Sequence, residues 1–288
     1  MKRSSEGLLF TDRGNDEDMS MKFVQKGIKK FQKGEFQEAE DEFVKAVEFN
    51  DISVRGWYYL GLVREELKDP DGASFCFKKA IAAAKMQDPV DEETTRNSLL
   101  KLAKIQFNEQ QYIAAMGFLR KINHMEYKDN EMQGNVWGML GEIYDQLKKK
   151  EYALFCYRNS QKSGNKKYRK LISAYEKEGI RPDDPEDKNS PNLLKRKADI
   201  MFNQQKFQDA IKVYTETLKV NNIKKVLTDA ANAEVTMKIA YAYINLQDFN
   251  NAKTYLEQAR KLYSKAKMKD EIKVIESTLN KINSLMSI

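Results

Sequence analysis

The sequence predicts an all-α fold built from repeated pairs of helices. Two segments start alike, WYYLG from Trp57 to Gly61 and WGMLG from Trp137 to Gly141, and similar strings follow them at the same distance, LKDPDGASFCF and LKKKEYALFCY. Such internal similarity is the signature of a repeat protein. The 288 residues include only five prolines, and the long proline-free stretches are rich in strong helix formers. No alternating apolar and polar run predicts a strand.

Six helical pairs follow from one recurring pattern. The second helix of each pair has an alanine with an aromatic residue or leucine four positions later, and the first helix has Gly or Ala twelve positions before that alanine. Close crossing of two helices requires a small residue, and the larger one fills the space beside the next pair. The six sets are Gly27/Ala39/Phe43, Gly61/Ala73/Phe77, Ala103/Ala115/Leu119, Gly141/Ala153/Tyr157, Ala198/Ala210/Tyr214 and Ala240/Ala252/Leu256.

The first part of the chain is expected to hold four of these pairs. Residues 1–19 are polar and acidic without a helical period, and we expect them to be disordered. Residues 20–179 contain pairs one to four and an extra helix over residues 166–178, which Gly179 ends as a C-terminal cap.

The remaining pairs follow a break. Residues 180–191 predict a loop that acts as a hinge, and Ser190 with Pro191 begins the next helix. Residues 192–267 contain pairs five and six. Residues 268–288 predict a C-terminal capping helix that covers the last pair; the alternative is a helix that binds a partner or a membrane surface. Its apolar stripe is Ile272, Ile275, Leu279, Ile282 and Leu285.

The pattern resembles the tetratricopeptide repeat, a helix–turn–helix unit of roughly 34 residues. The fourth pair carries the whole Trp-x-x-Leu-Gly-x-x-Tyr string, and the second pair has Arg64 where the tyrosine belongs. The resemblance covers roughly residues 20–265. It implies a helical solenoid, a right-handed superhelix whose first helices line a concave groove, and it implies a protein-binding scaffold.

The family's inward-facing positions, carried onto this chain, imply a partner-binding groove. Apolar and aromatic residues there suit an amphipathic helix or an extended peptide. For the first pair, the alternative is that the N-terminal tail or a second copy of the chain covers the apolar face. The expected groove residues are Val24, Ile28, Phe31, Tyr58, Leu62, Leu100, Phe107, Phe202, Met237 and Tyr241, with acidic Glu142 and Asp145 between the two apolar stretches.

Family members that hold the acidic tails of chaperones use a lysine–asparagine pair on one first helix. The matching positions here are Val24 and Ile28, Tyr58 and Leu62, or Lys195 and Asp199. The asparagine is missing from each, which disfavours binding of a chaperone tail.

The net charge of +7 is concentrated in the second half of the chain. Residues 1–165 have 26 Lys and Arg against 27 Asp and Glu, whereas residues 166–288 have 24 against 16. A basic half suits an acidic partner, a nucleic acid or an anionic membrane surface. The alternative is a solvated lysine-rich surface, which the interspersed acidic residues favour. The richest stretch is Arg260, Lys261, Lys265, Lys267 and Lys269.

No residue pattern predicts an enzyme, a metal site or a cofactor. His124 is the sole histidine, so no second histidine is present to complete a metal site or a triad. No glycine-rich phosphate loop is present. Cys76 and Cys156 occupy equivalent repeat positions and predict buried thiols in a reducing compartment. No signal peptide or transmembrane span is apparent, so we expect a cytoplasmic protein.

Three functions remain for comparison with the structure. The first is an adaptor or scaffold that binds a peptide or helix of another protein in the groove, with self-association as a further option and no small-molecule substrate. The second is a chaperone-like protein that holds a client. The third is nucleic-acid binding through the basic C-terminal half, which the lack of a regular base-reading pattern makes the weakest.

Overall fold

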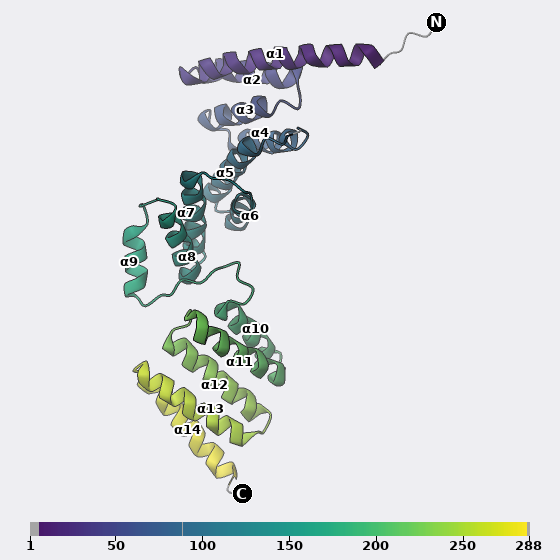
Figure 1. Ribbon diagram of the computed structural model, residues 1–288. Coiled ribbons are helices and arrows are strands. Elements are labelled where there is room, and N and C mark those ends of the chain that lie inside the picture. The colour runs from purple at the N-terminus through teal and green to yellow at the C-terminus, as the bar shows by residue number, and fades with distance from the viewer. Residues whose placement is uncertain (1–5, 88, 287–288) are drawn as a thin grey trace. The chain divides into compact units, whose positions relative to one another are not determined.

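The computed structural model describes residues 6–87 and 89–286, with side chains from residue 16 onward. This part of the chain consists of fourteen helices and contains no strand, so the predicted all-α helical-repeat fold is confirmed (Figure 1). The helices are α1 (Glu6–Gln32), α2 (Phe36–Phe49), α3 (Val54–Glu66), α4 (Pro70–Ala84), α5 (Glu92–Asn108), α6 (Tyr112–Asn123), α7 (Asn130–Gln146), α8 (Lys150–Lys162), α9 (Arg169–Lys177), α10 (Pro191–Asn203), α11 (Phe207–Lys224), α12 (Asp229–Asn245), α13 (Phe249–Lys265) and α14 (Lys269–Met286).

The chain forms two compact units, residues 1–139 and residues 140–288, which divide within α7. In the first unit α1 packs on α2, α3 on α4 and α5 on α6, and α2 and α4 also pack on the helix that follows them. In the second unit the pairs are α10/α11 and α12/α13, and α14 packs on α13. The expected division at residues 180–191 is therefore not where the compact units divide.

The small residues of the predicted register lie where paired helices cross. The second-helix alanines, Ala39, Ala73, Ala115, Ala153, Ala210 and Ala252, all have no exposed surface. In the three pairs that have glycine on the first helix, a ring from the second helix lies against that glycine. A Cβ atom added to Gly61 would stand 2.7 Å from Cε1 of Phe77, and one added to Gly141 would stand 2.4 Å from Cε1 of Tyr157. The glycine hydrogen thus leaves the space that the ring occupies.

In five of the six pairs, the larger residue on the second helix is matched with the smaller residue on the first helix. Glycine faces phenylalanine or tyrosine in pairs one, two and four, whereas alanine faces leucine in pairs three and six. Pair five is the exception, because Ala198 is paired with Tyr214; both are fully buried there. The crossing therefore has a nearly fixed volume that the two side chains share.

One turn geometry joins the two helices of every pair. The residue five positions before each second-helix alanine adopts a left-handed conformation, with φ between 58° and 80°. The next residue donates its backbone N–H to the carbonyl five positions earlier, as Asp69 does to Arg64 at 2.9 Å. This is the hydrogen bond of a Schellman turn. Only the first pair has glycine at the left-handed position; the six residues are Gly34, Lys68, Gln110, Lys148, Gln205 and Gln247.

The prediction of disorder over residues 1–19 is wrong for residues 6–19, because α1 begins at Glu6. Ser20 and Val24 are buried, at 2% exposed each, so the middle of α1 is fixed by packing. Adding residues to an existing helix costs far less than nucleating one. The helix therefore extends outward from its packed segment. Residues 1–5 lie outside the described part of the chain.

The connection between α9 and α10 is a loop, as predicted, but hydrogen bonds fix it at several points. Asp183 is 2% exposed; its N–H donates to the Glu151 carbonyl at 3.1 Å, and its carboxylate accepts from the Ser190 hydroxyl at 2.6 Å. Arg181 donates to the carbonyls of Lys225 and Leu227, at 3.1 Å each. These contacts are not those of a freely bending hinge.

The helix ends in this region follow the predicted signals. Gly179, with φ of 77°, ends α9, and Ile180 donates its N–H to the Tyr175 carbonyl at 3.0 Å. Ser190 caps α10 by accepting the Leu193 N–H, and Pro191 is in the first turn. The C-terminal capping helix is α14: Ile275, Leu279 and Ile282 are buried among residues of α12 and α13, while Leu285 is 56% exposed.

Replacing the second-helix alanine should destabilise the fold strongly. We expect each of Ala73→Arg, Ala153→Arg and Ala210→Arg to cost about 3 kcal/mol or more, because a long charged chain enters a filled crossing. Thermal unfolding followed by circular dichroism measures this. Ala82→Arg is the matched control on α4, since Ala82 is exposed. Melting of all three variants within about two degrees of wild type would contradict the assigned register.

At a crossing that has glycine, replacing the glycine by alanine should destabilise the protein, although this replacement normally stabilises a helix. Gly→Ala in a helix normally stabilises by about 1 kcal/mol, and Gly117→Ala on α6 should do so because no atom lies within 4 Å of the added Cβ. Gly61→Ala should instead destabilise by about 1–3 kcal/mol through contact with Phe77.

Adding Phe77→Leu to Gly61→Ala should restore part of the lost stability, because this recreates the alanine–leucine pairing of the third and sixth pairs. A double-mutant cycle on unfolding midpoints measures the coupling. Strictly additive effects of the two substitutions would show that ring and glycine do not share one space.

Candidate functional site

Four expected groove residues in the first compact unit are partly buried apolar side chains on α3 and α5. Tyr58 and Leu62 pack beside the buried cluster of Ala73, Phe77, Leu102 and Ile105. Leu100 and Phe107 of α5 have the same partial exposure, and the Phe107 ring meets the Tyr112 ring edge-on at 5.6 Å. The helices α3 and α5 pack on each other, and each has two of these partly buried apolar side chains.

A cleft of about 360 Å³ opens between α1, the first turn of α3 and the connection that precedes α5. Met21 and Ile52 are 45% and 43% exposed there. Val24 lines the cleft but is only 2% exposed, so it supports the cleft from the core. The lining residues are Glu17, Ser20, Met21, Val24, Asn50, Ile52, Ser53, Val54, Arg55, Gln87 and Asp91.

Ile28 and Phe31, the other expected groove residues of α1, are partly buried against the cluster that contains Phe43 and Val47. The Phe31 ring also meets the Phe36 ring edge-on at 5.6 Å. These side chains have a packing role within the first pair and retain some exposed surface.

One ion pair crosses the apolar face. Lys101 of α5 donates to Glu65 of α3 at 2.5 Å, and both side chains are less than one-third exposed. Burial, with Tyr59, Glu65 and Glu93 nearby, raises the pKa of Tyr58 to about 12, so its hydroxyl stays protonated at neutral pH. The face therefore combines apolar side chains, a neutral phenol and one internally neutralised pair.

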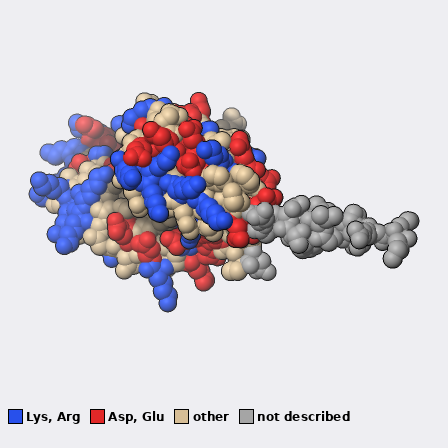
Figure 2. All heavy atoms as spheres, turned by 90° about the horizontal axis from the view of Figure 1, so that it is seen from above, with Lys and Arg blue, Asp and Glu red and all other residues tan. Residues whose placement is uncertain are grey.

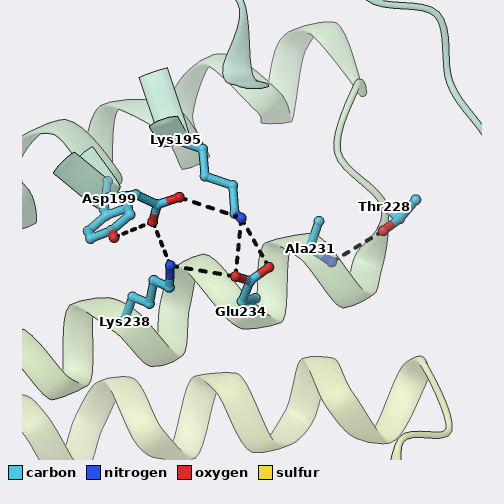
Figure 3. Close-up of polar contacts among 7 residues, drawn as sticks. Lys195, Asp199, Thr228, Ala231, Glu234 and Lys238 are labelled. Atoms are coloured by element: carbon cyan, nitrogen blue, oxygen red, sulfur yellow. Dashed lines mark hydrogen bonds and ion pairs between the residues drawn. The ribbon is translucent and has the colours of Figure 1, made fainter. Parts of the chain in front are cut away.

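The corresponding face of the second compact unit is occupied by its own charges. Lys195 and Asp199 of α10 meet Glu234 and Lys238 of α12 in a closed set of ion pairs (Figure 3). The shortest is Lys238 to Asp199 at 2.6 Å, and the hydroxyl of Tyr214 also donates to Asp199 at 2.6 Å. Burial opposes ionisation of Asp199, but the hydrogen bonds from Lys238 and Tyr214 and the charge of Lys195 outweigh it, so its pKa is lowered.

This network was missed by the sequence interpretation, although the sequence carries a signal for it. Lys195/Asp199 and Glu234/Lys238 are each four residues apart, with opposite order of charge, on the first helices of neighbouring pairs. Phe202, Met237 and Tyr241 lie on the same two helices and are partly buried; the Phe202 ring meets Phe207 edge-on at 5.4 Å.

The expected acidic stretch of the fourth pair is partly covered by α9. Asp145 accepts the hydroxyls of Tyr157 at 2.6 Å and Tyr175 at 2.5 Å, and Glu142 accepts the Tyr168 hydroxyl at 2.8 Å. Burial and these carboxylates raise the pKa of all three tyrosines.

The contacts of α9 are those of a first helix. Tyr168 stacks on Tyr157 at 4.5 Å, much as Tyr59 of α3 stacks on Phe43 of α2 at 5.5 Å. Thus α9 takes the place of the first helix of a further pair.

The basic C-terminal stretch mixes both signs of charge. Arg260 pairs with Glu257 at 2.8 Å, and Lys261 and Lys265 share a shallow hollow with Glu276. Figure 2 shows a different face, seen from above the view of Figure 1, on which basic and acidic side chains are also interspersed. Within the described residues no group of three or more His, Cys, Asp and Glu is placed to hold a metal ion. None of the described helices combines the length and the apolar character needed to cross a bilayer.

Comparison with solved structures gives only distant similarities. PilF of Pseudomonas aeruginosa is 17% identical, with a TM-score of 0.43 and coverage of 92% of this chain and 99% of that chain. A MamA structure is 15% identical, with a TM-score of 0.38 and coverage of 87% and 96%. YrrB, described as a tetratricopeptide-repeat protein with an unusual peptide-binding site, is 13% identical, with a TM-score of 0.34 and coverage of 76% and 91%. No curated protein sequence matches this chain.

The tetratricopeptide-repeat family model matches residues 134–163 and residues 233–265. The first segment covers most of α7 and α8, and the second covers most of α12 and α13. Both matched segments have the small-residue crossing and the left-handed turn, and the other four pairs have them in the same register. These two segments of the chain are tetratricopeptide repeats.

Proposed function

We propose that this protein is an adaptor that binds an apolar peptide or amphipathic helix of another protein on the first-helix face of α1, α3 and α5. Tetratricopeptide repeats indicate a protein-interaction role in general; the location and the kind of partner are our proposal. The observation that supports it most is the recurrence of partly exposed apolar side chains on neighbouring first helices beside an open cleft of about 360 Å³.

The arrangement suits a ligand that runs across the helices. Tyr58 and Leu62 are one helical turn apart on α3, and Leu100 and Phe107 are two turns apart on α5, so a ligand crossing both helices meets an aromatic and an aliphatic side chain on each. Partly buried aromatic residues with restricted motion tend to dominate interface energies. The Glu65–Lys101 pair supplies a polar edge that fixes orientation.

The equivalent face of α10 and α12 is a weaker candidate for the same ligand. Its two lysines and two acids already neutralise each other. An apolar ligand there would have to cover these charges, and burying a charge is costly unless its pairing remains complete. We therefore place the primary binding surface in the first compact unit.

A chaperone-like holder of a client and self-association are the alternatives that use the same face. A holder would bind many unrelated apolar segments with similar affinity, whereas an adaptor discriminates among them. A second copy of the chain would make binding depend on protein concentration. The experiment below separates these outcomes.

Loss of two aromatic side chains should weaken partner binding. The variant Tyr58→Ala/Phe107→Ala should reduce affinity for a partner recovered by affinity capture from the native cell at least ten-fold, equivalent to about 1.4 kcal/mol. The reason is that both rings contribute apolar area at the centre of the proposed surface. Titration calorimetry with the purified partner measures the change, and circular dichroism confirms that the variant remains helical.

The matched control is Lys265→Glu/Lys267→Glu, which changes charge on the C-terminal stretch of the second compact unit. It should alter binding less, and mainly at low ionic strength. If the lysine variant abolished capture while the aromatic variant bound normally, the proposed surface would be refuted and the basic stretch would replace it. Equal loss of many unrelated clients would favour the holder, and concentration-dependent dimers would favour self-association.

A further inference from the structure

The first helices α3 and α12 bury one face against the pair that precedes them. We call this the leading face. It has three residues, which are located from the Gly or Ala of the first helix at the crossing: one lies five positions before it, one lies directly before it, and one lies two positions after it. In α3, Leu60 and Val63 lie in one cluster with Phe43 and Val47 of α2. In α12, Val235 and Ile239 lie in one cluster with Tyr214 of α11. These four leading-face residues are at most 1% exposed.

The leading face of α10 differs, because its centre is exposed. Lys197 stands where α3 has Leu60 and α12 has Ile239, and it is exposed. Ile200, at the position of Val63 and of fully buried Ala242, is 57% exposed. Leu193, at the first position, is partly buried. The pair that precedes α10 in sequence therefore does not cover this face.

The start of the chain provides a comparison. In α1, the first of the described helices, the leading-face residues are Lys22, Lys26 and Lys29, and all three are exposed. A face that meets only solvent is thus fully lysine. The leading face of α10 has lysine only at its centre and retains leucine and isoleucine on either side, a composition that suits contact with another surface.

A groove continues this face between α10 and α11. Leu194 and Met201 of α10 and Val213 of α11 form its apolar part, and its volume is about 650 Å³. Its rim is formed by Asp209, Lys212, Thr215, Glu216 and Lys219. The apolar side chains are partly buried and remain accessible from the groove. The groove and the leading face together present one apolar strip on two adjacent helices.

The charges around the strip have a positive balance. Lys197, Lys212 and Lys219 are exposed and form no ion pair within the described residues, and Asp209 and Glu216 form none either. Three lysines against two acids favour an acidic partner. A second copy applying the same strip would bring its own Lys197 and the same positive excess, so like charges disfavour two-fold self-pairing.

We propose that the strip formed by Leu193, Leu194, Lys197, Ile200, Met201 and Val213 is a second docking surface, which binds an acidic amphipathic helix of a partner protein. The chain itself contains such an arrangement. The helix α2 has five acidic residues and one lysine, packs on the leading face of α3, and contributes Glu40 to an ion pair with Arg64 at 3.1 Å. The surface is separate from the first-helix face of α1, α3 and α5, so it stands whether or not that proposal holds.

The probe for this surface is a fluorescein-labelled synthetic peptide with the sequence of residues 35–50, which spans α2. We expect the full-length protein to bind it saturably in fluorescence anisotropy, with weaker binding as salt increases because lysine–carboxylate attraction is screened. Ile200→Asp and Lys197→Glu should each weaken binding at least five-fold. Both side chains are exposed, so the fold is expected to tolerate both substitutions.

Ile223→Asp is the control for introducing an aspartate at an exposed isoleucine, because Ile223 lies on α11, is 83% exposed and does not line the groove. It should bind the peptide as wild type does, and so should Tyr58→Ala/Phe107→Ala, which tests the other surface. A scrambled peptide of the same composition should not bind.

Three outcomes would overturn the proposal. The first is no saturable binding of the peptide up to about 1 mM, which corresponds to a binding free energy weaker than about 4 kcal/mol. The second is equal binding by wild type, Ile200→Asp and Lys197→Glu. The third is a wild-type dimer in analytical ultracentrifugation that Ile200→Asp dissociates, since the strip would then be an interface between copies.

Discussion

The close crossing of paired helices at one small residue is the constraint on which the rest of this structure depends. The backbone of α3 can approach α4 only because Gly61 leaves the space that the Phe77 ring fills. That approach sets the direction of both helices, and therefore decides which residues of α3 face the preceding pair and which face outward. Since five of the six pairs match glycine with an aromatic ring or alanine with leucine, the same geometry recurs with different side chains.

Two different surfaces result from one scaffold. In the first compact unit the outward positions of α3 and α5 have Tyr58, Leu62, Leu100 and Phe107, which remain partly exposed. In the second unit Lys195 and Asp199 of α10 stand where α3 has Tyr58 and Leu62, and they form ion pairs with Glu234 and Lys238 of α12. Because these side chains lie outside the crossing, their chemistry can change without changing the helix geometry. This separation allows a repeat scaffold to vary its ligand while retaining its fold.

The fold was largely predictable because its determinants are local. A small residue lies at each crossing, Gly179 follows α9, and Ser190 with Pro191 begins α10. Each of these residues can be recognised in the sequence. Features that join distant residues were not predictable in this way. The two tyrosine hydroxyls on Asp145 come from α8 and α9, and the buried Asp183 ties a loop to two other segments. The start of α1 was missed because helix propagation needs no apolar period. For the candidate site, the sequence identified the positions, whereas their exposure, the cleft beside α1 and the pairing of Lys195 with Glu234 required coordinates.

The left-handed turn residues show that the packing of the two helices determines the conformation of the turn between them. Five of the six are Lys or Gln, for which this conformation costs roughly 1–2 kcal/mol each relative to an ordinary helical residue. Their sum is comparable with the net stability of a small domain. The turns therefore do not drive the helices together; the packed helices impose the turn and compensate for its strain. Because packing imposes the turn, its residue keeps only a partial pattern, Lys or Gln in five pairs and Gly in the first, while the buried alanine five residues later is the same in all six pairs.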